Sequence, residues 1–166
     1  MPTIINPDSL DFKVNPDTLT DFNLKTLVPR LSGICNSKHL VFDMRQLEPG
    51  MYSFPYHFHR IAEELMLIIS GSLTLRSAEG FKIINKGELV FFEAGETGVH
   101  QFYNHDEVSC VYLDIKTNFG IDIVEYPDSG KVNISPLGMI FEKDTQVNYN
   151  KGEENIREIW NKLSND

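Results

Sequence analysis

Short apolar segments separated by turn residues recur between residues 40 and 141, and this spacing limits the fold more than any other feature of the sequence. Strands that follow one another roughly every 8–12 residues are typical of antiparallel sandwiches and barrels, not of alternating α/β units. We therefore predict an all-β fold. The expected strands cover residues 39–47, 51–59, 65–70, 73–76, 81–84, 89–92, 99–103 and 108–115.

The length of 166 residues suits one domain with an extension at each end. Residues 1–30 contain four prolines, so we expect a turn-rich, irregular arm laid over the body. Residues 31–145 are expected to form the barrel, and residues 146–166 a tail.

One helix is predicted in the tail, over residues 153–163. Its apolar side chains recur at the spacing i, i+3, i+4 and i+7, which puts them on one face. These residues are Ile156, Ile159, Trp160 and Leu163. We expect this face to dock on the barrel.

The charge of the chain excludes several classes of partner. Lys and Arg number 15 against 24 Asp and Glu, which gives a formal net charge of −9. Without a basic cluster, such a chain lacks the surface that nucleic acids and anionic membranes bind. No apolar run approaches the ~20 residues of a membrane span, and the N-terminus has no signal-peptide pattern. We therefore expect a cytoplasmic protein without nucleic-acid or membrane partners, with Cys35 and Cys110 as reduced thiols.

Three features of the sequence carry metal-binding chemistry. His57 and His59 alternate with Phe58 at the end of an expected strand, so both lie on one face, ~6.6 Å apart along the strand. Imidazoles at that spacing can converge on one ion. Glu63-Glu64 follows after a short turn and offers a carboxylate oxygen, and His100 opens a later strand.

The order of these residues matches a motif of the cupin superfamily, in which a glycine precedes H-x-H, a glutamate and a second glycine. Here Gly50 is followed after six residues by His57-x-His59, after four more by Glu64, and after six more by Gly71. This spacing favours Glu64 over Glu63 as the motif's glutamate.

The second cupin motif runs from a glycine through P-x-G to a histidine and an asparagine. Here Gly87 is followed after five residues by Glu93-x-Gly95, after four more by His100, and after three more by Asn104. Glu93 stands where the motif has proline, and the gap before His100 is two residues longer. The chain thus resembles a single-domain bacterial cupin, of the cupin type-2 kind.

The resemblance implies a double-stranded β-helix, the cupin jelly-roll barrel, and one divalent metal ion per chain. By this resemblance the metal ligands are His57, His59, Glu64 and His100. The chemistry of the residues agrees, because three imidazoles and one carboxylate suit Fe, Mn, Ni, Co, Cu or Zn, whereas cysteine-type sites are excluded. The alternative is an ion-free pocket in which the same groups transfer protons.

A divalent ion among these groups would favour a small oxygen chelator: a sugar, a hydroxy- or keto-acid, a diketone or a catechol-like diol. We expect a metal-dependent enzyme, such as an isomerase, dioxygenase, decarboxylase or hydrolase. The alternative is a non-catalytic cupin that binds or senses a small molecule. Candidate acid or base groups beside the ion are Glu63, Tyr103 and Tyr112.

Other polar residues near the motifs are assigned less specific roles. A phosphosugar would need cations in the pocket, for which Arg60, Arg76 and Lys82 are the candidates. Asp122 is expected to be exposed, and His105 is expected to lie in an exposed turn without a role.

A row of aromatic residues predicts a homodimer. If His57 and His59 point into the barrel, alternation sends Tyr52, Phe54, Tyr56 and Phe58 to the opposite face of the same strand. Four exposed aromatic side chains would exceed the apolar patch that soluble monomers usually carry. We expect a second copy to cover them, with the chain's own N-terminal arm or the helix that carries Trp160 as the alternative covers.

Overall fold

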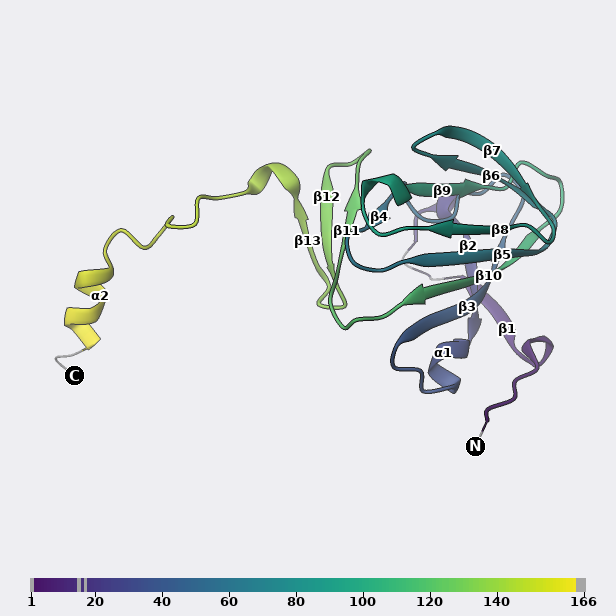
Figure 1. The fold of residues 1–166 in the computed structure, drawn as a ribbon, viewed down its shortest axis with the longest axis horizontal. Helices are drawn as coiled ribbons and strands as arrows, with labels where there is room; N and C mark the ends of the chain where they lie inside the picture. The colour runs from purple at the N-terminus through teal and green to yellow at the C-terminus, as the bar shows by residue number, and fades with distance from the viewer. Residues whose placement is uncertain (1, 15, 17, 164–166) are drawn as a thin grey trace.

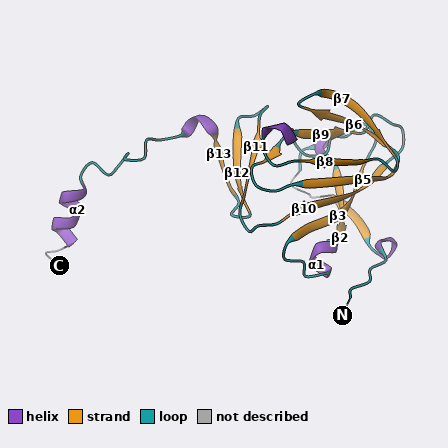
Figure 2. Ribbon diagram, in the orientation of Figure 1, coloured by secondary structure: helices purple, strands orange, loops and turns teal. Residues whose placement is uncertain are grey.

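Antiparallel strands form the body of the protein, as the turn spacing predicts (Figures 1 and 2). The structure is a computed structural model that describes residues 2–14, 16 and 18–163. Its strands form three sheets, and every pairing between described strands is antiparallel. The all-β prediction is confirmed.

The largest sheet has six strands in the order β1-β2-β3-β10-β5-β8. These strands are β1 (Asp11–Val14), β2 (Leu24–Val28), β3 (Leu40–Leu47), β10 (Cys110–Thr117), β5 (Glu64–Ser70) and β8 (Leu89–Phe92). A four-stranded sheet contains β13 (Met139–Glu142), β12 (Lys131–Ser135), β11 (Asp122–Tyr126) and β4 (Phe58–His59), in that order. A three-stranded sheet contains β7 (Gly80–Asn85), β6 (Ser72–Ser77) and β9 (His100–Tyr103).

Helices are few and short. The α-helices are α1 (Leu31–Ile34) and α2 (Ile156–Leu163), and the 3-10 turns are η1 (Pro7–Ser9), η2 (Thr20–Phe22), η3 (Glu96–Gly98) and η4 (Lys143–Thr145). Among the described residues, no helix has the length and apolar character that crossing a membrane requires.

Strand β10 lies between β3 and β5 and runs from the apolar core to the polar end of the barrel. Alternation buries Cys110, Tyr112 and Asp114 on β10, while Glu64 and Met66 are buried on β5. The apolar members pack in one core cluster: Leu24, Leu47, Met66, Ile68, Leu73, Leu75, Ile84, Phe92, Phe102, Cys110 and Tyr112. Both cysteines are free thiols, as expected.

A fully buried amide, Asn104, ties two turns of the barrel together. Its Nδ2 donates to the carbonyls of Leu47 (2.8 Å) and Val108 (2.9 Å), and its Oδ1 accepts from the N–H of Asp106 (3.0 Å). Its own carbonyl accepts from the N–H of Gly50. All the polar atoms of this side chain are therefore satisfied, as burial requires.

The N-terminal segment, expected to be an irregular arm, instead contributes two strands to the largest sheet. Strands β1 and β2 pair with each other, and β2 pairs with β3, so these two strands extend the largest sheet at its edge. The prolines at positions 7 and 29 lie outside these strands, where the missing N–H breaks no ladder.

The expected strand over residues 51–59 is wrong for most of its length. Only Phe58–His59 forms a strand, and Tyr52 and His57 make isolated bridges to Tyr103 and His100. Pro55 has no N–H to donate. The backbone N–H groups of Tyr52, Ser53 and His57 donate to the carbonyl oxygens of Asp21, Phe102 and His100 in turn, so the segment does not follow one neighbouring strand.

Because this segment is irregular, its four aromatic residues do not form one exposed row. Tyr52 packs against Tyr103, with ring centroids 4.8 Å apart, while the Arg76 guanidinium lies 3.8 Å from the centroid of Tyr56. Phe54 lines a cavity and is 36% exposed, Tyr52 is 40% exposed, and Phe58 is buried. The expected row of four is therefore reduced to two separate exposed aromatic side chains.

The tail helix exists but differs in its start and in its packing. It begins at Ile156, three residues after the expected start, and the tail carries it away from the barrel (Figure 1). Ile156, Ile159 and Trp160 are exposed, Trp160 by 69%. The expectation that this face docks on the chain's own barrel is wrong.

Candidate metal centre

The three motif histidines meet at one end of the barrel. His57 and His59 flank Phe58 and point to the same side, with ring centroids 5.2 Å apart. His100 is the first residue of β9, and its backbone exchanges two hydrogen bonds with that of His57. The rings of His57 and His100 therefore lie close, with centroids 4.7 Å apart.

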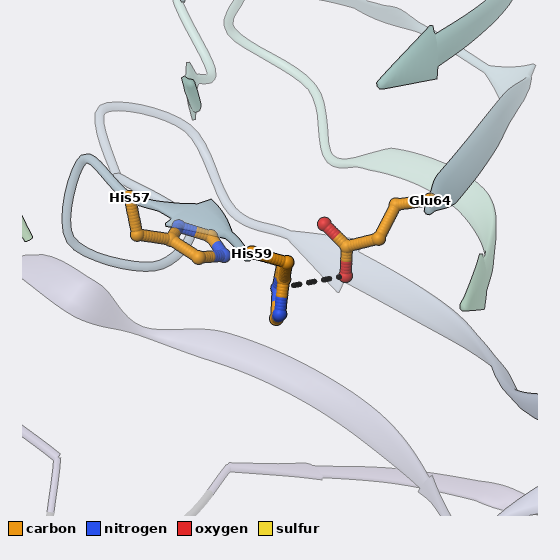
Figure 3. Close-up of side chains that lie close together, drawn as sticks. All are labelled: His57, His59 and Glu64. Atoms are coloured by element: carbon orange, nitrogen blue, oxygen red, sulfur yellow. Dashed lines mark ion pairs between the residues drawn. The ribbon is translucent and has the colours of Figure 1, made fainter. Parts of the chain in front are cut away.

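Glu64 projects from the start of β5 into this group of imidazoles (Figure 3). Its Oε1 lies 3.4 Å from Nε2 of His59, and its Oε2 lies 3.2 Å from Nε2 of His100. One ligand atom from each of His57, His59 and Glu64 falls within 4.8 Å of the other two. Glu63 points outward and is exposed, because strand alternation reverses its direction.

Each histidine is oriented by an acceptor at its Nδ1 atom. The Nδ1 atoms of His57 and His100 lie 2.8 Å and 2.9 Å from the carbonyl oxygens of Pro55 and Gly98. A carbonyl oxygen only accepts, so in both residues Nδ1 carries the proton and Nε2 carries the lone pair. Such outer partners are characteristic of metal-binding histidines.

Asp122 supplies the third acceptor, to Nδ1 of His59, and corrects the expectation that it is exposed. It is buried at the start of β11, where Oδ1 also accepts from the backbone N–H groups of Ile61 (3.2 Å) and Ala62 (3.4 Å). No local signal marks this role, because 63 residues separate Asp122 from His59 and only the pairing of β11 with β4 joins them.

Two buried atoms of the site have no hydrogen bond: Oε2 of Glu64 and Nε2 of His100. Both atoms bear lone pairs, and they face each other at 3.2 Å. Such a pair is unfavourable in a buried site unless a proton or a cation lies between the atoms. Three imidazole nitrogens and one carboxylate are also ligands that divalent transition metals prefer, so the residues fit a metal ion.

The pKa values of these groups reflect burial and their mutual contacts. Burial and the neighbouring His100 lower the pKa of His57 to about 3. Burial opposes ionisation of Glu64, but its close contacts with the imidazoles of His100 and His59 outweigh it and hold its pKa well below the usual range. Burial also lowers the pKa of His59, yet its hydrogen bonds to Asp122 and Glu64 raise it overall. Glu64 is therefore an anion at neutral pH, with neutral His57 beside it.

The loop before His100 accommodates both departures from the second motif. Its extra residues form the 3-10 turn η3, which ends at Gly98. A Cβ atom at Gly98 would lie 2.0 Å from the carbonyl oxygen of Glu93, so no larger residue fits here. This close approach brings the Gly98 carbonyl to Nδ1 of His100.

A cavity of about 220 Å³ opens beside His57, His59 and Glu64, while His100 does not line it. Its charged lining comprises Arg30, Arg45, Lys116, Glu64 and Asp114. The cations expected here from the sequence lie elsewhere. Arg60 pairs with Glu125, Arg76 pairs with Asp128, and Lys82 lines a different hollow on the surface.

The three expected acid or base groups do not line this cavity either. Glu63 is exposed and Tyr103 stacks on Tyr52. Tyr112 is fully buried in the apolar core, and this burial raises its pKa further above the ordinary value. Besides the histidines and Glu64, the side chains that line it and can transfer a proton include Asp114, Lys116 and Tyr126.

Comparison with known proteins agrees with this architecture. Residues 44–116 match the model of the Cupin domain family. No curated protein matches the sequence significantly.

Solved structures with the same fold include two described as sugar phosphate isomerases. One, a cupin superfamily protein from Silicibacter pomeroyi, has a TM-score of 0.76 and 21% identity over 89% of this chain and 98% of its own. The other, a putative enzyme from Acidithiobacillus ferrooxidans, has a TM-score of 0.67 and 25% identity over 75% and 80%. A polyketide cyclase from Streptomyces resistomycificus has a TM-score of 0.59 and 14% identity over 90% and 89%. The chain thus has the cupin fold, and its residues 44–116 match the Cupin domain family.

Proposed function

We propose that the protein binds one divalent metal ion per chain through His57, His59, Glu64 and His100. The observation that carries this proposal is the grouping of three imidazoles, each with its Nδ1 on an outer acceptor, around a buried carboxylate whose Oε2 faces the unpartnered Nε2 of His100. When bound, a divalent ion would supply Lewis-acid polarisation of an oxygen ligand.

The proposed activity is metal-dependent catalysis on a small oxygen-chelating molecule. The cavity suits a ligand of a few carbon atoms, and its charged side chains offer both hydrogen-bond donors and acceptors. Asp114 and Lys116 would hold or move protons at the ligand's oxygen atoms. The similarity to a putative sugar phosphate isomerase at 25% identity favours an enzyme over a passive binding protein.

A non-catalytic small-molecule sensor is the second candidate, because the acid and base groups predicted from the sequence lie away from the cavity. Turnover separates the two functions. The metal-loaded protein should convert at least one compound from a panel of sugars, hydroxy- and keto-acids, diketones and catechols, monitored by proton NMR. Conversion should stop with chelator and in His100→Ala. Binding without conversion of any compound would favour the sensor.

Removal of one histidine should release the ion. We expect about one ion per chain in the wild type and a loss of affinity of at least about tenfold in His59→Ala and His100→Ala, since each removes a ligand. Metal analysis of untagged protein measures this. His105→Ala is the matched control, because His105 is exposed and bonds only to side chains of the neighbouring strand, so its ion content should be unchanged. Full occupancy in both site variants would contradict the ligand assignment.

Metal stabilisation should depend on pH with a defined sign. The ion binds neutral imidazole, and the pKa of His59 is raised, so protons compete at His59 as the pH falls through its folded-state pKa. His57, with a pKa of about 3, stays neutral throughout. A chelator should therefore lower the melting temperature clearly at about pH 8 and little at about pH 5. Equal shifts at the two pH values would contradict this coupling.

We also propose that the protein is a homodimer in which each α2 packs on the other copy. The helix leaves its own barrel with Ile156, Ile159 and Trp160 exposed. The barrel surface has a hollow of about 380 Å³, whose lining combines the exposed Phe81 and Phe91 with Lys82 and two glutamates. An apolar helix face of this kind is stabilised by packing against a matching surface.

The dimer proposal predicts a mass near twice 19.0 kDa in light scattering on a size-exclusion column. Trp160→Glu should yield the monomer mass, because it places a charge in the apolar contact. Tyr149→Glu is the control, since Tyr149 is 96% exposed on the same tail outside the helix. A wild-type monomer at high micromolar concentration would refute the dimer.

A further inference from the structure

Arg45 is a buried cation that uses one of its five N–H donors within the protein. It projects inward from β3, is 7% exposed, and donates from Nε to Oδ2 of Asp114 at 3.0 Å. Neither of its terminal nitrogens donates a hydrogen bond to any residue that the structure describes. Four N–H bonds of a buried guanidinium thus have no protein acceptor.

These free donors face the cavity and not the apolar core. Arg45 lines the cavity, and its terminal nitrogens are not among the enclosed unpaired atoms of the described residues. Phe54 covers the guanidinium from one side, with its ring centroid 5.5 Å from Cζ, and Asp114 occupies the Nε edge. The remaining edge presents two parallel donors to a ligand in the cavity.

This edge lies within reach of a small ligand that also contacts the proposed metal site. Glu64 pairs with Lys116, so Asp114 is its diagonal neighbour on the same face, where side chains are ~7–8 Å apart. Phe54 joins the two regions, because its ring also packs edge-on against His57, with centroids 5.9 Å apart. One compact molecule of a few carbon atoms would span this gap.

The charge of the cavity favours an anion. Arg30, Arg45 and Lys116 line it against two acidic side chains, Glu64 and Asp114. A bound divalent ion would add to this positive excess. The flat two-donor edge of a guanidinium matches a carboxylate in two parallel hydrogen bonds, and a singly charged group is repelled less by Asp114 than a dianion would be.

We propose that Arg45 binds the carboxylate of a small hydroxy- or keto-acid whose remaining oxygen atoms face His57, His59, Glu64 and His100. The contact of the carboxylate with Arg45 does not depend on the proposed metal centre, whereas the placement of the ligand's remaining oxygen atoms does. Asp114 is a positioning residue, which holds the guanidinium through Nε and leaves the opposite edge free.

Calorimetric titration of the metal-loaded full-length protein tests this. The probes are glycolate, lactate, 3-hydroxybutanoate, pyruvate and acetoacetate, with propane-1,2-diol as the uncharged counterpart of lactate and inorganic phosphate as the rival anion. At least one carboxylate should bind, and Arg45→Gln should weaken it by at least about tenfold, the loss expected for a charged bidentate contact. Ion content should stay unchanged, since Arg45 is not a proposed ligand.

A second variant separates a loss of carboxylate binding from a loss of folding. Arg45→Gln leaves Asp114 buried without its partner, whereas Arg45→Gln/Asp114→Asn replaces the pair by neutral groups that still hydrogen-bond each other. It should bind carboxylates as weakly as the single variant. Arg76→Gln is the matched control, because both terminal nitrogens of Arg76 already bind Asp128 at the surface, and its carboxylate affinity should equal that of the wild type.

The outcomes separate this inference from the metal proposal. Carboxylate binding to ion-free protein that Arg45→Gln abolishes would support the role of Arg45 even if no metal bound. Equal carboxylate affinity in wild type and double variant, tighter binding of phosphate than of every carboxylate, or equal binding of lactate and propane-1,2-diol would each overturn it.

Discussion

In every motif histidine, Nδ1 is hydrogen-bonded to an acceptor that the fold holds in place. The geometry of the site depends on these three hydrogen bonds. The acceptors are the carbonyls of Pro55 and Gly98 and the carboxylate of Asp122. Because a neutral imidazole has one lone pair, an occupied Nδ1 directs the other nitrogen toward the centre. The acceptors lie on three separate segments, so the Nε2 atoms converge only once the barrel has closed.

Strand pairing divides the interior of this barrel into an apolar and a charged end. Along β10 the inward residues change from Cys110 and Tyr112 to Asp114, and along β5 the charged Glu64 precedes the apolar Met66. The register between these strands brings the two carboxylates to the same end. Buried charge is unfavourable unless it is paired. Arg45 pairs with Asp114, and Glu64 lies against His59 and His100 in the proposed metal centre.

The cavity therefore combines two kinds of recognition in about 220 Å³. One wall offers imidazole nitrogens and a carboxylate, which favour a divalent cation. That cation would in turn bind oxygen atoms of the ligand. The other offers the free edge of Arg45, which selects an anion. A ligand that satisfies both walls must carry its charged group and its chelating oxygens a few bonds apart, which limits its size as much as its chemistry.

The sequence by itself determined the all-β class, from the spacing of its turns, and the identity of the residues that meet at the site, from the spacing of His57, His59, Glu64 and His100. These are short-range patterns, since alternation decides which side chains share a face. Only the tertiary structure decided that Asp122 is buried against His59 and that the Arg45 guanidinium, not the nearer cations of the motifs, lines the cavity. It also decided that α2 lies away from its own barrel (Figure 1). The positions of Asp122 and Arg45 depend on strands that pair although 60 or more residues separate them, and the periodicity of one strand carries no information about its partner.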